Sequence, residues 1–104
     1  MLFLCNSRMA PGVKREQVIA YLASTRMSAV GWNLVRREII SHVLWKVGER
    51  PGVAFTVNAD GERAVRRVLD ELEPVKSGLI EFDIDPVSPF RQFDQQLAAN
   101  RSAD

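Results

Sequence analysis

One short segment of the chain carries the residues best suited to acid-base chemistry. Glu38 and His42 stand four residues apart in a stretch, 38–47, that is rich in β-branched and aromatic residues. A histidine side chain titrates near neutral pH and can both take and return a proton, and a carboxylate in apolar surroundings can do the same. Both residues are therefore candidate catalytic groups. The structural alternatives are a hydrogen-bonded strand histidine and a solvated carboxylate at the start of a strand.

Alternation along this stretch predicts which side chains share a face. With a period of two, one face carries Glu38, Ile40, His42, Leu44 and Lys46, and the other carries Ile39, Ser41, Val43, Trp45 and Val47. Both titratable groups then lie on one face, where they can line the two ends of a pocket that holds a small ring. The pattern predicts that His42 faces a cavity while Val43 and Trp45 pack under helices.

Aromatic and acidic residues elsewhere are candidates for substrate binding. Trp32 and Trp45 are expected in the core first and against a ligand second, because large aromatic side chains fill small cores by default. Glu81 and Asp83 form the polar face of the last strand. There they either contact a ligand, at a site shared between two subunits, or protect a sheet edge from wrong pairing.

The elements that position these residues follow from apolar periodicity and turn residues. Residues 1–7 and 79–86 are predicted as the first and last strands, and 38–47 and 53–58 as a hairpin around a turn at 48–52. A long helix is predicted over 14–35, bent or interrupted at Gly31, and a second one from an N-cap at Asp60 to a stop before Pro74. This βαββαβ order predicts an α+β ferredoxin-like fold, with an antiparallel sheet of order 4-1-3-2 and two helices on one face.

Two predicted strands, residues 2–5 and 39–45, are apolar on both faces. Two helices on one side leave the second face of such a sheet uncovered, so another copy of the chain is its simplest cover. The sequence therefore predicts a dimeric α/β barrel with a domain at 1–86. The tail at 87–104 is predicted to reach across the partner, anchored by Phe90 and Phe93.

Composition limits the functional classes. The 104 residues include 14 basic and 13 acidic ones, and a net charge of +1 gives no field to attract nucleic acid or an anionic membrane. Apolar runs are too short to span a bilayer and the start lacks a basic n-region, so a cytoplasmic protein is expected. A single cysteine and a single histidine predict no disulfide and no metal site, and Cys5 is expected to be a small buried hydrophobe.

Several short motifs occur in order along most of the chain: MLFL at the start, Arg37-Glu38 after the first helix, LWKVG at 44–48, AFTV at 54–57 and IEFDIDPVSP at 80–89. In this the chain resembles the muconolactone isomerase family of small dimeric α/β-barrel proteins. Lys46 stands where that family usually has arginine, and LEPVKSG at 72–78 replaces an aromatic and proline-containing segment. The resemblance implies a cofactor-independent isomerase of aromatic catabolism that acts on a small unsaturated lactone or a related acid, with Lys46 among its substrate-binding residues.

Three functional classes stay open. The first is this isomerase, with His42 and Glu38 as acid-base groups. The second is a cofactor-free oxygenase or cyclase of the antibiotic-biosynthesis α/β-barrel type, in which a tryptophan and a histidine orient a polycyclic phenol. The third is a non-catalytic small-molecule-binding or structural dimer. A small pocket with a titratable group favours the first class, a large flat aromatic pocket the second, and a filled interior the third.

Overall fold

Four strands and four helices make up the part of the chain that the structure, a computed structural model, describes: residues 1–24 and 29–88. The strands are β1 (Leu2–Met9), β2 (Ile40–Lys46), β3 (Gly52–Asn58) and β4 (Ile80–Val87). The helices are α1 (Arg15–Ser24), α2 (Ala29–Arg36), α3 (Glu62–Asp70) and α4 (Glu73–Lys76). None of the helices in these residues is long and apolar enough to cross a membrane.

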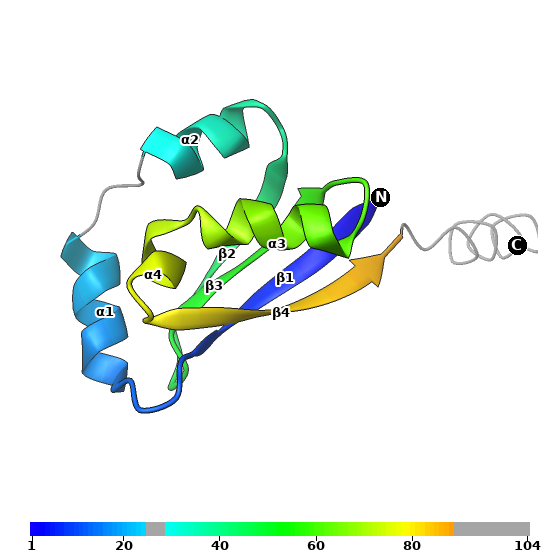
Figure 1. The fold of residues 1–104 in the computed structure, drawn as a ribbon. Helices are drawn as coiled ribbons and strands as arrows, with labels where there is room; N and C mark the ends of the chain where they lie inside the picture. The colour runs from blue at the N-terminus through cyan, green and yellow to red at the C-terminus, as the bar shows by residue number, and fades with distance from the viewer. Residues whose placement is uncertain (25–28, 89–104) are drawn as a thin grey trace, which may run out of the picture.

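The strands form one antiparallel sheet in the order β2-β3-β1-β4, which Figure 1 shows behind the helices. This is the predicted order 4-1-3-2 counted from the other edge, so the prediction of an α+β ferredoxin-like fold is confirmed. Phe90 and Phe93, the predicted anchors of the tail, lie outside the described residues.

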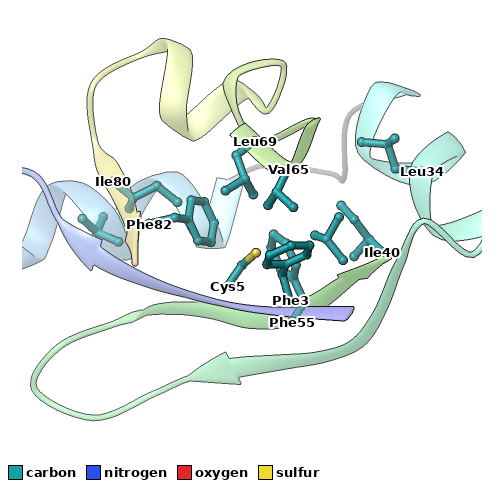
Figure 2. Packing of buried hydrophobic residues seen from close by; sticks show 11 residues of the cluster. Phe3, Cys5, Leu34, Ile40, Phe55, Val65, Leu69, Ile80 and Phe82 are labelled. Carbon is teal, nitrogen blue, oxygen red and sulfur yellow. The ribbon is translucent and has the colours of Figure 1, made fainter. Parts of the chain in front are cut away.

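The core lies on the side of the sheet that faces the helices, here called the covered face. Figure 2 shows Phe3, Cys5 and Phe55 rising from the strands toward Val65 and Leu69 of α3. The ring centroids of Phe55 and Phe82 lie 5.2 Å apart across the sheet. The buried apolar residues are Phe3, Cys5, Val18, Leu34, Ile40, Phe55, Val57, Val65, Leu69, Ile80 and Phe82.

Cys5 is fully buried in this core. Burial raises the pKa of its thiol to about 11, and the positive charge of Arg66 only partly offsets this. A neutral buried thiol is neither a nucleophile nor a metal ligand. The prediction that Cys5 is a small buried hydrophobe is therefore confirmed.

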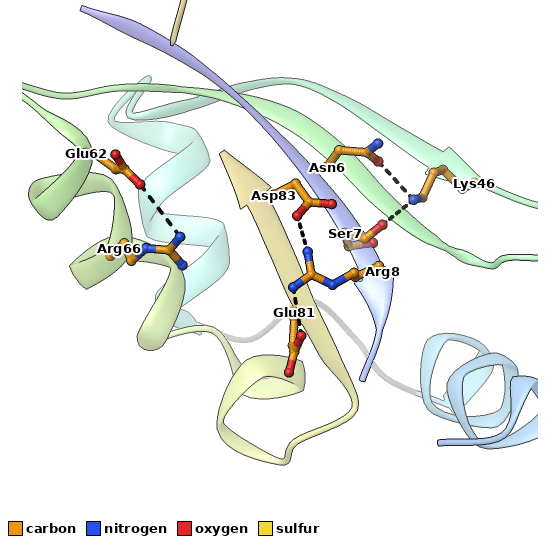
Figure 3. Close-up of polar contacts among 8 residues, drawn as sticks. All are labelled: Asn6, Ser7, Arg8, Lys46, Glu62, Arg66, Glu81 and Asp83. Atoms are coloured by element: carbon orange, nitrogen blue, oxygen red, sulfur yellow. Dashed lines mark hydrogen bonds and ion pairs between the residues drawn. The ribbon is translucent and has the colours of Figure 1, made fainter. Parts of the chain in front are cut away.

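The opposite side of the sheet, here called the open face, has no helix against it in the described residues. Its side chains pair across the strands: Leu2, Leu4, Asn6 and Arg8 of β1, Ser41 and Leu44 of β2, Ala54 and Thr56 of β3, and Glu81, Asp83 and Asp85 of β4. Arg8 forms ion pairs with Asp83 and, at 3.0 Å, with Glu81 (Figure 3). The hydrogen bond to Asp83 is the main reason why the pKa of Arg8 is raised.

The helices differ from the prediction at three places. The prediction of a single helix over 14–35 was wrong. The helices α1 and α2 lie on either side of residues 25–28, which are not described, and they run in different directions in Figure 1. Gly31 does not interrupt a helix but lies buried within α2. The N-cap of α3 is Gly61 rather than Asp60. Pro74 lies in the first turn of the short helix α4, where a missing backbone N–H breaks no hydrogen bond within the helix.

The predicted face assignment fails at the start of β2 because the strand contains a β-bulge. Ile40 pairs with Val57 and Ser41 with Thr56, but the next pair is Leu44 with Ala54, so an extra residue is inserted in β2. Its backbone has a positive φ of 54° at His42. Ile40 is therefore buried on the covered face and Ser41 pairs on the open face, the reverse of the period-two prediction.

The expectation that both tryptophans fill the core was also wrong. Trp32 is 54% exposed and Trp45 is 57% exposed. On α2 the buried positions are Gly31 and Leu34, so Trp32 points away from the core. Trp45 lies near the end of the edge strand β2, where fewer neighbours cover it.

We expect Gly52→Ala to lower the free energy of unfolding by about 1 to 3 kcal/mol, the usual cost of overpacking. A Cβ at position 52 would stand 2.2 Å from the Ser7 Oγ, which is held in place as acceptor for the Val53 N–H at 2.8 Å. Urea unfolding followed by circular dichroism measures the change. Gly48→Ala is the matched control, because a Cβ there meets no atom within 4 Å, and equal losses in the two variants would contradict the close approach.

Candidate functional site

A cavity of about 180 Å³ lies between the covered face and the helices. Val18 and Leu22 of α1, the α3–α4 link and strands β2 to β4 supply most of its wall, which is predominantly apolar. A cavity of roughly 150 Å³ with such walls can hold a benzene ring. The volume therefore fits a ligand with one ring.

Two side chains in the cavity wall can exchange protons, Tyr21 of α1 and Glu73 of α4. The Tyr21 hydroxyl is buried, whereas Glu73 is exposed and so lies where the cavity meets solvent. The sequence prediction missed both. Tyr21 follows Val18 by three residues, a spacing that places it on the same side of α1, and Glu73 belongs to the segment 72–78, where the chain departs from the family motif.

A second, more open groove of about 400 Å³ adjoins the cavity. It is formed by Arg15, Ile19 and Leu22 of α1 and by the β2–β3 hairpin, residues 45–48 and 51. Leu22 and Trp45 line both the groove and the cavity, so the two hollows meet at these side chains.

Lys46 lines the groove, but its ammonium group is bonded to two acceptors on β1, one of them a side chain of the open face. Its Nζ donates to the Asn6 Oδ1 at 2.9 Å and to the backbone oxygen of Ser7 (Figure 3). Both acceptors are uncharged, and no ion pair with Lys46 occurs among residues 1–24 and 29–88. An ammonium group has three N–H donors, which leaves one for a ligand.

The His42 side chain lies on the open face, in a cluster of hydroxyl groups. Its Nδ1 is 2.9 Å from the Thr56 Oγ1 and 3.1 Å from the Ser41 Oγ, and the two hydroxyl oxygens are 2.8 Å apart. Because His42 does not line the cavity, it can act only on a molecule bound to the open face. Its predicted catalytic role stays a prediction.

The other predicted site residues are spread over the molecule. Glu38 is exposed in the turn between α2 and β2, with a φ of 60° and its N–H donating to the Val35 oxygen at 3.0 Å. Glu81 and Asp83 are paired with Arg8 on the open face. Of the predicted set, Trp45 lines both hollows and Lys46 the groove, while Glu38, His42, Trp32, Glu81 and Asp83 line neither. Within residues 1–24 and 29–88, no three His, Cys, Asp or Glu residues gather as a metal ion requires.

The strand order and the helices define the class of fold but not a protein family. No family model matches the chain, and no curated protein matches it. Among solved structures, it is similar to 5-chloro-2-hydroxyhydroquinone dehydrochlorinase (TftG) from Burkholderia phenoliruptrix, determined in complex with 2,5-dihydroxybenzoquinone. The two share 17% sequence identity with a TM-score of 0.64, over 88% of this chain and 98% of that chain. At this identity the likeness shows the fold alone.

We expect His42→Gly to be more stable than His42→Ala by about 1 kcal/mol, the cost that a side chain pays at positive φ. Both variants lose the same imidazole contacts, so their difference reports the backbone at the bulge. Thermal unfolding measures it. The neighbouring pair Ser41→Gly and Ser41→Ala is the control. There glycine should be the less stable by about 0.5 to 1 kcal/mol, and the same sign at both positions would contradict the bulge geometry.

Proposed function

We propose that the protein is a cofactor-independent enzyme that moves a proton within a single-ring substrate, as an isomerase of a small unsaturated lactone or a related acid. The observation that carries the proposal is the small apolar cavity with Tyr21 and Glu73 in its wall. A small pocket with a titratable group is the feature that separates this class from the other two.

The proposed reaction needs one base and one hydrogen-bond donor. The Glu73 carboxylate removes a proton from the carbon beside the carbonyl, the electron pair moves onto the carbonyl oxygen, and the proton returns at the far end of the double bond. The Tyr21 hydroxyl donates a hydrogen bond to that oxygen as it becomes negative. The apolar walls keep water from the intermediate, and no oxidant or cofactor takes part.

The alternatives fit the cavity less well. Ligand pockets for larger molecules measure roughly 300 to 1,000 Å³, so a polycyclic phenol, the substrate expected of the oxygenase or cyclase class, exceeds the cavity. A non-catalytic structural dimer needs no cavity at all. The ligand of TftG, a benzoquinone with one ring, supports a single-ring substrate.

We also propose that the protein works as a dimer that buries the open face. Leu4 and Leu44 are 38% and 67% exposed on it, and Leu2 and Ala54 extend the same apolar patch. A second copy would bring further groups toward the cluster of His42, Ser41 and Thr56. A site on this face is where the predicted role of His42 in catalysis belongs.

We expect the wild-type protein to catalyse deuterium incorporation into α-angelica lactone, a β,γ-unsaturated five-membered lactone, in D₂O. Glu73→Gln should slow this exchange by about 10²- to 10⁴-fold, the usual contribution of a general base. Proton NMR measures the rate. Glu71→Gln is the matched control, because Glu71 is an exposed carboxylate two residues away that does not line the cavity.

Two outcomes would contradict the proposal in different ways. A wild-type rate equal to that of buffer would reject the isomerase activity. A loss of exchange in His42→Gln but not in Glu73→Gln would reject the cavity as the site and move the chemistry to the open face.

We expect light scattering at micromolar concentration to give at least twice the chain mass of 11.7 kDa. Leu44→Arg should produce a monomer, because it places a charge in the apolar patch of the open face. Val30→Arg, which changes an exposed apolar residue on α2 instead, is the control and should leave the dimer intact. A wild-type monomer would reject the dimer.

A further inference from the structure

We infer that His42 is the nucleophile of a second site, on the open face of the sheet, which transfers the acyl group of a small aryl ester to water. The inference goes beyond the proposed function, because it concerns another face of the sheet and another reaction. It rests on two hydroxyl groups, those of Ser41 and Thr56, which hold the His42 ring with its proton on Nδ1 and leave Nε2 unprotonated.

The cluster of hydroxyl groups around His42 contains four polar contacts. The Ser41 Oγ, the Thr56 Oγ1 and the His42 Nδ1 form a triangle with sides of 2.8, 2.9 and 3.1 Å. In the fourth contact, the Thr56 hydroxyl donates to the backbone oxygen of Ser41 at 3.2 Å. A hydroxyl group has one proton to donate and two lone pairs that accept. Inside the triangle, Thr56 is therefore an acceptor.

This count decides which ring nitrogen of His42 carries the proton. The Thr56 Oγ1 lies 2.9 Å from Nδ1 and has already given its proton to Ser41, so the proton between the two atoms belongs to Nδ1. A bare Nδ1 would place two lone pairs against each other at this distance. In a neutral imidazole only one nitrogen carries a proton. The His42 Nε2 is therefore unprotonated and available as a nucleophile.

The same count excludes the two hydroxyl groups as nucleophiles. A serine or threonine is activated when its O–H group donates to a neighbouring base. Here the Thr56 O–H group donates to the backbone, and Nδ1 is a donor rather than an acceptor. Neither hydroxyl can pass its proton to His42, so the reactive atom of the cluster is Nε2.

The reaction balances without a cofactor. The Nε2 lone pair attacks the ester carbonyl carbon, the bond to the aryl oxygen breaks, and the aryloxide leaves with the electron pair. The acylated ring is positively charged, so the hydrogen bond from Nδ1 to Thr56 becomes stronger. Water then attacks the acyl group, which leaves as the free acid and restores the Nε2 lone pair. The proton released from that water ends on the aryloxide.

The surroundings of His42 suit an aryl leaving group. Leu44 lies two residues further along β2 and is 67% exposed, and Leu4, which pairs with Thr56, is 38% exposed. An aryl ring can lie on these apolar side chains while its ester group reaches Nε2. The His42 side chain is exposed and belongs to an edge strand, so an ester can approach it from solvent at the border of the open face.

The position of the proton is tested by two-bond proton–nitrogen correlation NMR at a pH at which the ring is neutral. His42 is the only histidine of the chain, so its ring signals are identified directly. We expect Nδ1 to carry the proton in the wild type and in Thr56→Ser, which keeps the hydroxyl, and this preference to be lost in Thr56→Val. A proton on Nε2 in the wild type would overturn the inference, whatever the folding of the variants.

The activity is tested by the release of 4-nitrophenolate from 4-nitrophenyl acetate. His42→Gln should remove most of the rate that the protein adds to that of buffer. Thr56→Val should lower this added rate by about tenfold, the effect of one hydrogen bond to a charged group, and Thr56→Ser should keep it. Lys76→Gln is the matched control, because it removes an exposed amine on α4 and should leave the rate unchanged. Equal rates in the wild type and His42→Gln would overturn the assignment of His42 as the nucleophile.

Discussion

The arrangement of both candidate sites depends on the single extra residue in β2. In β2, His42 and Val43 lie between two successive ladder pairs, where the partner strand β3 has only one residue. The side chains of β2 therefore change face within the strand. Ile40, Val43 and Trp45 consequently all line the cavity, while His42 lies among hydroxyl groups on the open face. Without the bulge, strict alternation from Ile40 would turn His42 into the cavity. The sequence pattern places His42 on the face away from the helices, and its side chain does lie on that open face, but among hydroxyl groups. One inserted residue thus separates the histidine from the ring-sized space.

The order of the strands could be predicted because its signals are local. Ile80, Phe82 and Ile84 alternate with acidic residues, and Pro51 with two glycines marks the hairpin turn. The bulge had no such signal: β2 is apolar at positions of both parities, so either register looks acceptable, and no glycine marks the positive φ. The cavity wall is non-local as well. Tyr21 and Glu73 are 52 positions apart in the printed sequence, and only the packing of α1 and α4 over one sheet brings them to the same space.

A small group of contacts at the end of β1 connects the cavity to the groove. Gly52 lacks a side chain, which lets the Ser7 Oγ approach and accept the Val53 N–H where the ladder between β1 and β3 ends. The backbone oxygen of Ser7 in turn accepts a hydrogen bond from Lys46. Ser7 therefore contacts Gly52 and Val53 through its hydroxyl group and the Lys46 ammonium group through its backbone oxygen. Packing and charge placement depend on the same few atoms here, so a change in one alters the other.

The position of Glu73 bears on how a cofactor-free enzyme of the proposed kind would work. Glu73 is exposed at the cavity wall, so its carboxylate has contact with solvent, while the rest of the wall is mostly apolar. Arg15 and Lys46 line the groove, whereas Glu73 lines only the cavity. In the proposed function, the ring of the substrate lies in the cavity beside Tyr21 and Glu73. The proposed site therefore relies on shape more than on polar contacts, because the walls of the cavity are mostly apolar.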